Sequence, residues 1–178
     1  SALGFGCMRF PVGPLGIDLA KAEKLVADAF AGGVNYFDTA YNYPGNEAAL
    51  GQILSRQPLR DQIYLATQLP LTRCHRREYF DSLFETQLER LGTDYVDYYL
   101  MPAISGSAQW EGLQALGIEV FLREKNSSCA ITLLGFSCRG SHGDFLALLD
   151  PSHWDFWQSQ YNYIQRDPAD RATRMKAR

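Results

Sequence analysis

The alternation of two kinds of apolar pattern along the chain restricts its fold more than any other feature. Six short segments rich in aromatic and β-branched residues are expected to be strands, at residues 3–7, 34–40, 62–68, 94–101, 130–137 and 154–163. Amphipathic segments lie between them, and successive strand ends are mostly about 30 residues apart, the length of one βα unit. This order predicts a parallel sheet in which helices connect the strands.

The amphipathic segments carry apolar residues at every third or fourth position, which indicates helices. The first helix follows Asp18, which is expected to cap it, and ends at Gly32 and Gly33. The other helices are expected at residues 46–54, 76–92, about 113–123 and about 143–149. Together with the strands they account for most of the chain.

Two architectures of parallel sheet compete for this pattern. A doubly wound sheet that binds a nucleotide has a glycine-rich turn leading from its first strand into a helix, but a loop follows "LGFGCMRF" here. A (β/α)8 barrel carries its functional residues at the carboxyl ends of its strands, where this sequence has its polar residues. We therefore expect an α/β fold of the (β/α)8 TIM-barrel type, with about six of the eight βα units present. The partial barrel is expected to cover residues 1–165, and the basic tail at 166–178 is expected to be frayed or disordered.

The composition is that of an ordinary globular domain and argues against several classes of protein. Hydrophobic residues make up 46% of the chain, and the formal net charge of -3 provides no basic face for nucleic acid. The chain has no apolar run of about 18 residues, so we expect no membrane span. Its cysteines lack the C-x-x-C spacing of metal sites, so we expect no metal, reduced thiols and a cytoplasmic protein: they are Cys7, Cys74, Cys129 and Cys138.

A polar cluster follows the second expected strand, in the stretch "GVNYFDTAYNYPGNE". It contains the carboxyl group of Asp38 and the phenol of Tyr43, which are both able to take part in proton transfer. The next two strands end at Gln68 and Pro102, whose side chains cannot act as acid or base. The residues alone leave two interpretations of Asp38 open, a cap of the following loop or helix and a member of a reaction site.

Five strand ends resemble the aldo-keto reductase superfamily, in order and at its spacing. They are "GVNYFDTAYNYPGNE", "IYLATQLP", "LERLGTDYVDYYLM", "LLGFSCRG" and "WQSQYNY". The phrases are most similar to the bacterial branch that often carries a C-terminal iron-sulfur extension, and the chain resembles a truncated member. The resemblance implies a barrel that uses NADPH or NADH to reduce aldehydes and ketones, with a catalytic tetrad of Asp, Tyr, Lys and His.

Two members of the tetrad carry over and two do not. Asp38 and Tyr43 match the pattern D-T-A-x-x-Y, whereas Gln68 stands at the lysine position and Pro102 at the histidine position. A lysine would make the tyrosine more acidic, so its absence beside a carboxylate is expected to raise the tyrosine pKa instead. Proline also lacks a donor that could orient the substrate oxygen.

The resemblance also implies residues for the cofactor. Ser137 and Gln158 match the family's nicotinamide-binding serine and glutamine, and Gly6, Cys7 and Met8 match the backbone beside the cofactor. The alternatives remain open that Ser137 satisfies backbone groups at the strand end and that Gln158 has a structural role.

Two hypotheses for the function follow. The chain is either an oxidoreductase with impaired or lost activity on small carbonyl compounds, or a catalytically inactive pseudoenzyme or binding module on the same fold. A chain that starts at Ser1 inside a strand pattern is expected to be trimmed. A six-stranded sheet would leave two strand edges unpaired, so we expect a second copy, another partner or further chain to cover them.

Overall fold

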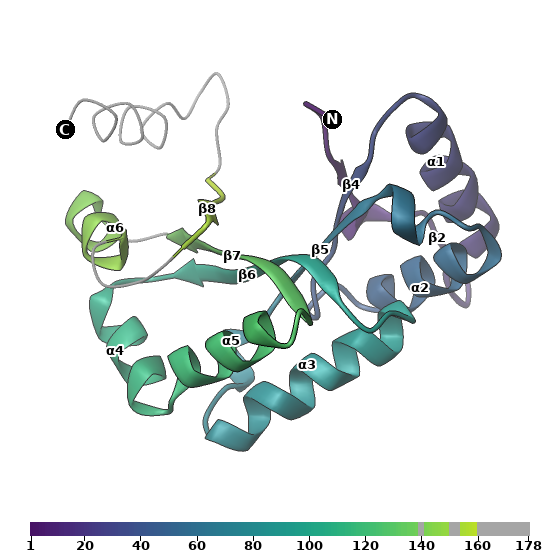
Figure 1. Cartoon of the computed structure of the whole chain (residues 1–178). Helices are drawn as coiled ribbons and strands as arrows, with labels where there is room; N and C mark the ends of the chain where they lie inside the picture. Colours follow the sequence, from purple (N-terminus) through teal and green to yellow (C-terminus); the bar gives the residue numbers. More distant parts are fainter. Residues whose placement is uncertain (139–140, 150–153, 160–178) are drawn as a thin grey trace.

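The computed structural model describes residues 1–138, 141–149 and 154–159, and its centre is a curved six-stranded sheet (Figure 1). The strands are β1 (Phe5–Gly6), β4 (Tyr36–Asp38), β5 (Tyr64–Gln68), β6 (Val96–Ile104), β7 (Ile131–Cys138) and β8 (Phe156–Trp157). They lie in chain order, and each pairs in parallel with its neighbours. Chain order and parallel pairing are the arrangement of successive barrel units. The predicted parallel sheet is confirmed.

Helices cover the convex face of this sheet, and the opposite, concave face carries none in the part of the chain described (Figure 1). They are α1 (Leu19–Ala31), α2 (Asn46–Arg56), α3 (Arg77–Leu91), α4 (Ser107–Ala115), α5 (Ile118–Ser127) and α6 (His142–Leu149). Short 3-10 turns lie at η1 (Cys7–Arg9), η2 (Arg60–Gln62) and η3 (Leu71–Arg73). None of the described helices is long and apolar enough to cross a membrane.

Local sequence explains where several of these elements begin and end. The Asp18 side chain accepts a hydrogen bond from the Lys21 amide at 3.2 Å, which confirms the predicted cap of α1. The single helix predicted near residues 113–123 is wrong, because Gly117 adopts a φ of 83° and divides it into α4 and α5. Glycine reaches this left-handed conformation without strain, so the chain turns there.

The N-terminal region contains one feature that was not predicted. Strands β2 (Val12–Gly13) and β3 (Gly16–Ile17) form an antiparallel hairpin outside the main sheet. The first and last strands of the main sheet are also shorter than expected. Residues 160–178 lie outside the described residues, and so do the tail predicted at 166–178 and the end of the strand predicted at 154–163.

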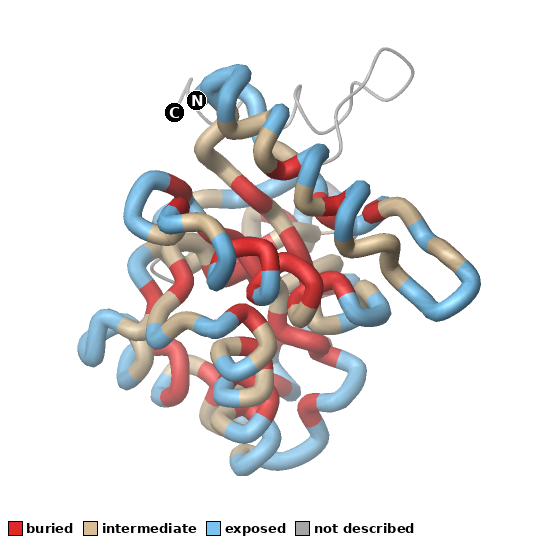
Figure 2. Tube along the Cα trace, turned by 90° about the vertical axis from the view of Figure 1, so that its right-hand side faces the viewer, coloured by how far each residue is buried: buried red, intermediate tan, exposed pale blue. Residues whose placement is uncertain are grey.

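The two faces of the sheet differ in burial because side chains alternate along each strand. Phe37, Tyr99 and Phe136 face the helices and are fully buried, and Figure 2 shows the buried trace where helices meet sheet. On the concave face the Tyr98 ring lies 5.1 Å from the Tyr36 ring and 5.2 Å from the Phe156 ring, measured between centroids. These three side chains are only partly buried. The concave face is therefore an aromatic layer that the described helices leave open.

Two glycines allow close approach inside this arrangement. A Cβ atom at Gly51 in α2 would overlap the backbone of Arg90 and Leu91, so α2 and α3 can cross only at a glycine. A Cβ atom at Gly135 in β7 would overlap the Phe156 ring. The first contact lets α2 pack directly against α3. The second lets the Phe156 ring of β8 lie directly on β7, on the concave face of the sheet.

Candidate active site

Asp38 and Gln68 end the adjacent strands β4 and β5, and their side chains meet. Asp38 pairs in register with Ala66, two residues before Gln68 on the same face of the sheet. Gln68 Nε2 donates to Asp38 Oδ1 at 3.4 Å, a long hydrogen bond. The Gln158 side chain, which follows β8, lies close enough to Asp38 to lower the pKa of its carboxyl group. The ends of β4, β5 and β8 therefore bring Asp38, Gln68 and Gln158 to the same end of the sheet.

The Asp38 carboxylate has no cation beside it. Burial raises its pKa to about 6, and the hydrogen bonds from Gln68 and Gln158 oppose that shift. Among residues 1–138, 141–149 and 154–159, none of the ion pairs includes Asp38. At neutral pH the Asp38 carboxyl group is therefore largely ionised. Within the described structure, the side chains that stabilise its negative charge are neutral amides.

Tyr43 lies in the turn between β4 and α2, where its amide donates to the Ala40 carbonyl at 3.0 Å. Burial raises the pKa of Tyr43, and the Asp38 carboxylate raises it further, while a hydrogen bond with Gln68 acts in the opposite direction. Tyr43 is therefore a weaker acid than an ordinary tyrosine. An acid catalyst at neutral pH needs the opposite shift.

The segment from Gly6 to Met8 lies on the other side of Asp38. Gly6 in β1 pairs in register with Asp38, and a Cβ atom built on Gly6 would meet nothing within 4 Å. Cys7 is fully buried, burial raises the pKa of its thiol, and its carbonyl accepts a hydrogen bond from Asn46 Nδ2. Met8 is 59% exposed. Open space therefore borders Asp38 at Gly6.

Pro102 lies in a bulge of the central strand β6. Met101 pairs with Phe136 and Ile104 with Cys138, so β6 has one residue more than β7 between these pairs. Proline cannot donate to the ladder of a central strand, and a bulge is where a sheet tolerates it. Ala103 follows with a φ of 52°, outside the usual range of a non-glycine residue.

Ser137 in β7 stabilises this bulge. Its Oγ atom accepts a hydrogen bond from the Ala103 amide at 2.6 Å. Ser137 thus satisfies a backbone group at the strand end, as the structural alternative predicted. Its hydroxyl proton can still be donated to a ligand. Gln158 is exposed, and its backbone N–H donates to the Phe136 carbonyl at 2.9 Å. Its side chain acts on the Asp38 carboxyl group and lowers the pKa of that group, so Gln158 combines a structural contact with access from outside.

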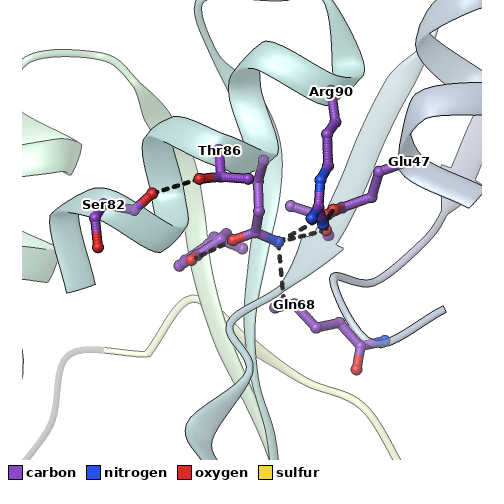
Figure 3. Close-up of polar contacts among 8 residues, drawn as sticks. Glu47, Gln68, Ser82, Thr86 and Arg90 are labelled. Atoms are coloured by element: carbon purple, nitrogen blue, oxygen red, sulfur yellow. Dashed lines mark hydrogen bonds and ion pairs between the residues drawn. The ribbon is translucent and has the colours of Figure 1, made fainter. Parts of the chain in front are cut away.

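Sequence reasoning missed a buried polar network behind the site (Figure 3). Gln87 of α3 donates from Nε2 to Glu47 Oε1 at 2.9 Å and to the Gln68 carbonyl at 3.0 Å. The Gln87 amide also contacts Thr67 Oγ1 at 2.9 Å and accepts from the Tyr99 hydroxyl at 2.8 Å. Through Gln87 the helix α3 therefore fixes the backbone of Gln68, which contacts Asp38.

The network contains a charge that is compensated. Glu47 is 2% exposed, and its Oε2 atom lies 3.2 Å from Nη1 of Arg90. The Arg90 guanidinium in turn lies over the Tyr41 ring, 4.3 Å from its centroid. A glutamine within the apolar stripe of α3 was the sequence feature that could have revealed this network, because a buried amide requires partners.

The same part of the chain matches a known family. The family model described as "Aldo/keto reductase family" matches residues 2–130. An aldo-keto reductase of Mycolicibacterium vanbaalenii is 37% identical over 103 residues, covering 54% of this chain and 36% of that protein. A probable aldo-keto reductase 1 of Glycine max is 32% identical over 123 residues, covering 62% of this chain and 35% of that protein. The matched part is thus about a third of each relative.

Solved structures agree over almost the whole chain. The aldo-keto reductase AKR11C1 from Bacillus halodurans, in its holo form, superimposes with a TM-score of 0.77 at 27% identity, covering 98% of this chain and 58% of that one. The thermostable aldo-keto reductase Tm1743, in complex with the inhibitor epalrestat, gives a TM-score of 0.74 at 24% identity and shows the fold alone. The (β/α)8 barrel type is therefore shown, with part of its units in this chain. The family model, the sheet and the strand-end residues agree, and the chain belongs to the aldo/keto reductase family.

Proposed function

We propose that this chain is a family oxidoreductase whose NAD(P)H-dependent reduction of aldehydes and ketones is impaired. One observation carries the proposal: a neutral amide, Gln68, lies 3.4 Å from the Asp38 carboxylate at the position where the family has a lysine. No cation of the described residues forms an ion pair with Asp38. The group that would make Tyr43 acidic is thus replaced by one without charge.

Carbonyl reduction needs a hydride and a proton. NADPH or NADH, when bound, supplies the hydride. The proton must come from a side chain near the substrate oxygen, and Tyr43 is the hydroxyl that the strand-end geometry offers. Because burial and the Asp38 carboxylate raise the pKa of Tyr43, its proton is held more tightly than in a tyrosine beside a cation. Pro102 adds no donor to orient the oxygen.

The residues at the nicotinamide end are compatible with the cofactor. Ser137 retains a hydroxyl proton, since the Ala103 amide uses only one of its acceptor positions. Gln158 is exposed and can present its amide. Gly6 borders open space, so its backbone can be approached closely. These three residues would hold the nicotinamide amide and ring.

Reductase assays on the wild type, a tetrad-intact relative and three variants test the proposal. We expect the wild-type chain to oxidise NADPH with 4-nitrobenzaldehyde at least about a hundredfold more slowly than a tetrad-intact relative, since acid-base catalysis is worth about 10² to 10⁴. Gln68→Lys and Pro102→His together should raise the rate more than either change alone. The lysine restores tyrosine acidity, and the histidine restores orientation.

Tyr43→Phe is the control for the position of the site. It should abolish the activity that Gln68→Lys restores, because phenylalanine keeps the ring and loses the proton. Fast turnover by the wild type that persists in Tyr43→Phe would contradict the proposal, since the chemistry would then lie elsewhere.

The second candidate is a pseudoenzyme or binding module on the same fold. It is favoured by the loss of two tetrad groups at once, Gln68 and Pro102. Quenching of tryptophan fluorescence by NADPH separates the two, because the indoles of Trp110, Trp154 and Trp157 report on the β7 and β8 side. Binding without turnover in any variant supports the module, and absence of binding excludes both roles for the 178-residue chain.

A further inference from the structure

The concave face contains one carboxylate and no cation among the residues described. Strand alternation and register identify its side chains. Those near the Asp38 carboxylate that are not buried are Gly6, Tyr36, Gln68, Tyr98 and Phe156, and Gln158 follows β8 at the same end. The salt bridges of the described residues all involve other carboxylates. Among the described residues Asp38 is thus an anion with two neutral amides and no cation beside it, at the end of an aromatic surface.

Aromatic side chains flank this anion. Tyr36 is two residues before Asp38 on the same face of β4, about 7 Å along the strand. Tyr43 lies on the side of the turn, and the pKa of both phenols is raised by burial first and by the Asp38 charge second. The face of a tyrosine ring attracts cations. Anion and rings together therefore favour a positively charged group.

The surroundings leave room for a ligand. Asp38 is partly exposed, and on the β1 side its register neighbour is Gly6, where a Cβ atom would meet nothing within 4 Å. The neighbours that act on the carboxylate are two neutral amides, Gln68 at the long distance of 3.4 Å and Gln158. A small group can therefore approach the carboxylate from the Gly6 side without displacing a buried side chain.

We propose that the Asp38 end of the concave face binds a small organic ammonium group, with the carboxylate of Asp38 opposite its charge and the tyrosine rings beside its alkyl groups. The site does not depend on cofactor or turnover, and the proposal goes beyond the reductase function. The ligand is recognised by a single positive charge on an apolar body. A neutral molecule of the same shape lacks the attraction to the carboxylate, and a small inorganic cation lacks the contact with the rings.

Ligand-observed NMR on the complete chain tests the proposal. The probe is tetramethylammonium, whose methyl signal should broaden on addition of protein, with affinity on the order of millimolar. Matched controls are tert-butanol, which has a similar shape and no charge, and sodium chloride at the same ionic strength. Equal broadening of the tert-butanol signal, or no broadening of either, would overturn the proposal.

Variants locate the site. Asp38→Asn should weaken tetramethylammonium binding at least about tenfold, since it removes the charge and keeps the shape. Gln68→Lys should have the same effect, because the lysine supplies an internal cation to Asp38. Asp94→Asn, which removes an exposed carboxylate, is the matched control and should leave binding unchanged. Tyr43→Phe should retain binding and Tyr43→Ala should weaken it, since the ring rather than the hydroxyl is needed.

Dependence on pH provides an independent check. The ionisable groups that face Asp38 are Cys7, Tyr36 and Tyr43, whose pKa values are raised, so they stay neutral between about pH 5 and 8. Asp38, with a pKa of about 6, is the group that titrates in this range. Tetramethylammonium affinity should fall about tenfold from pH 7 to 5. Affinity that does not change with pH, or that survives Asp38→Asn in a folded protein, would place the ligand elsewhere and refute the assignment. Both outcomes are independent of NADPH turnover.

Discussion

Asp38 is an ionised group whose position lowers the stability of the fold at neutral pH. Its pKa of about 6 in the folded protein lies above the ordinary value of 3.8. The folded state therefore binds a proton more tightly than the unfolded state. Stability from this group is present below about pH 4 and is lost as pH rises through about 6. The cost above pH 6 is at most about 3 kcal/mol, from a difference of about two pKa units.

Replacing Asp38 with asparagine should remove that cost. We expect Asp38→Asn to raise the free energy of unfolding by about 1 to 3 kcal/mol at pH 8, and to have little effect near pH 4, where the aspartate is protonated. Urea unfolding of both proteins at the two pH values measures the difference. A loss of stability in the variant at pH 8 would show that Asp38 is compensated by a cation that the described residues do not include.

The sequence predicts part of this site and not the rest, for a physical reason. Asp38 and Gln68 follow from strand ends, because parallel strands bring their carboxyl ends to one edge. The bond from the Ala103 amide to Ser137 does not follow, since it depends on a one-residue register shift in β6. Register is a property of two strands together, and a pattern within one strand does not contain it.

Among the helices and strands, too, some could be predicted from the sequence and others could not. Apolar patterns identified all six strands of the main sheet, even β1 and β8, which have two residues each. They failed for the hairpin of β2 and β3, which lies in a loop rich in glycine and proline where no strand pattern stands out. They also joined α4 and α5, because the apolar spacing continues across Gly117 while the backbone does not. The glycine was the visible sign of that break.

One buried amide connects α3 to β5 by hydrogen bonds. Gln87 is fully buried and links Glu47, Thr67, Tyr99 and the Gln68 carbonyl. An apolar side chain in its place would leave these polar groups without partners, and each unsatisfied buried group costs about 1 to 3 kcal/mol. The network thus stabilises the fold and holds the strand end that carries the candidate site.

We expect Gln87→Leu to lower the free energy of unfolding by about 2 to 4 kcal/mol, since several bonds are lost and part of the cost is recovered by relaxation. Thr86→Ala is the matched control on the same helix. Within the described part of the chain the Thr86 hydroxyl bonds only to the Ser82 carbonyl one turn earlier, at 2.8 Å, so its loss should change stability by less than about 0.5 kcal/mol (Figure 3). Chemical denaturation compares the two. Equal effects would mean that the Gln87 network contributes nothing specific.

At the scale of the whole molecule, the sheet is open. Among the described strands, β1 and β8 each pair on one side only, whereas β4 to β7 pair on both. A closed barrel has no such edges, and exposed edges recruit other strands. The matched part of the Bacillus halodurans structure is 58% of that chain. The edges and the aromatic concave face are the surfaces where this chain differs most from a closed barrel.

We therefore expect the 178-residue chain to associate through its sheet edges as its concentration rises. Hydrogen exchange measured by mass spectrometry at about 1 and 100 μM should show β5, β6 and β7 protected at both, since they pair on two sides. Peptides that cover β1 and β8 should exchange fast at the lower concentration and gain protection at the higher one. The hairpin of β2 and β3 is the internal control, because its strands are as short as β1 and β8 and lie outside the main sheet.

Light scattering should report masses above 20.1 kDa over the same range of concentration. A constant mass of 20.1 kDa with unchanged exchange at β1 would show that an open edge in this fold does not need a partner.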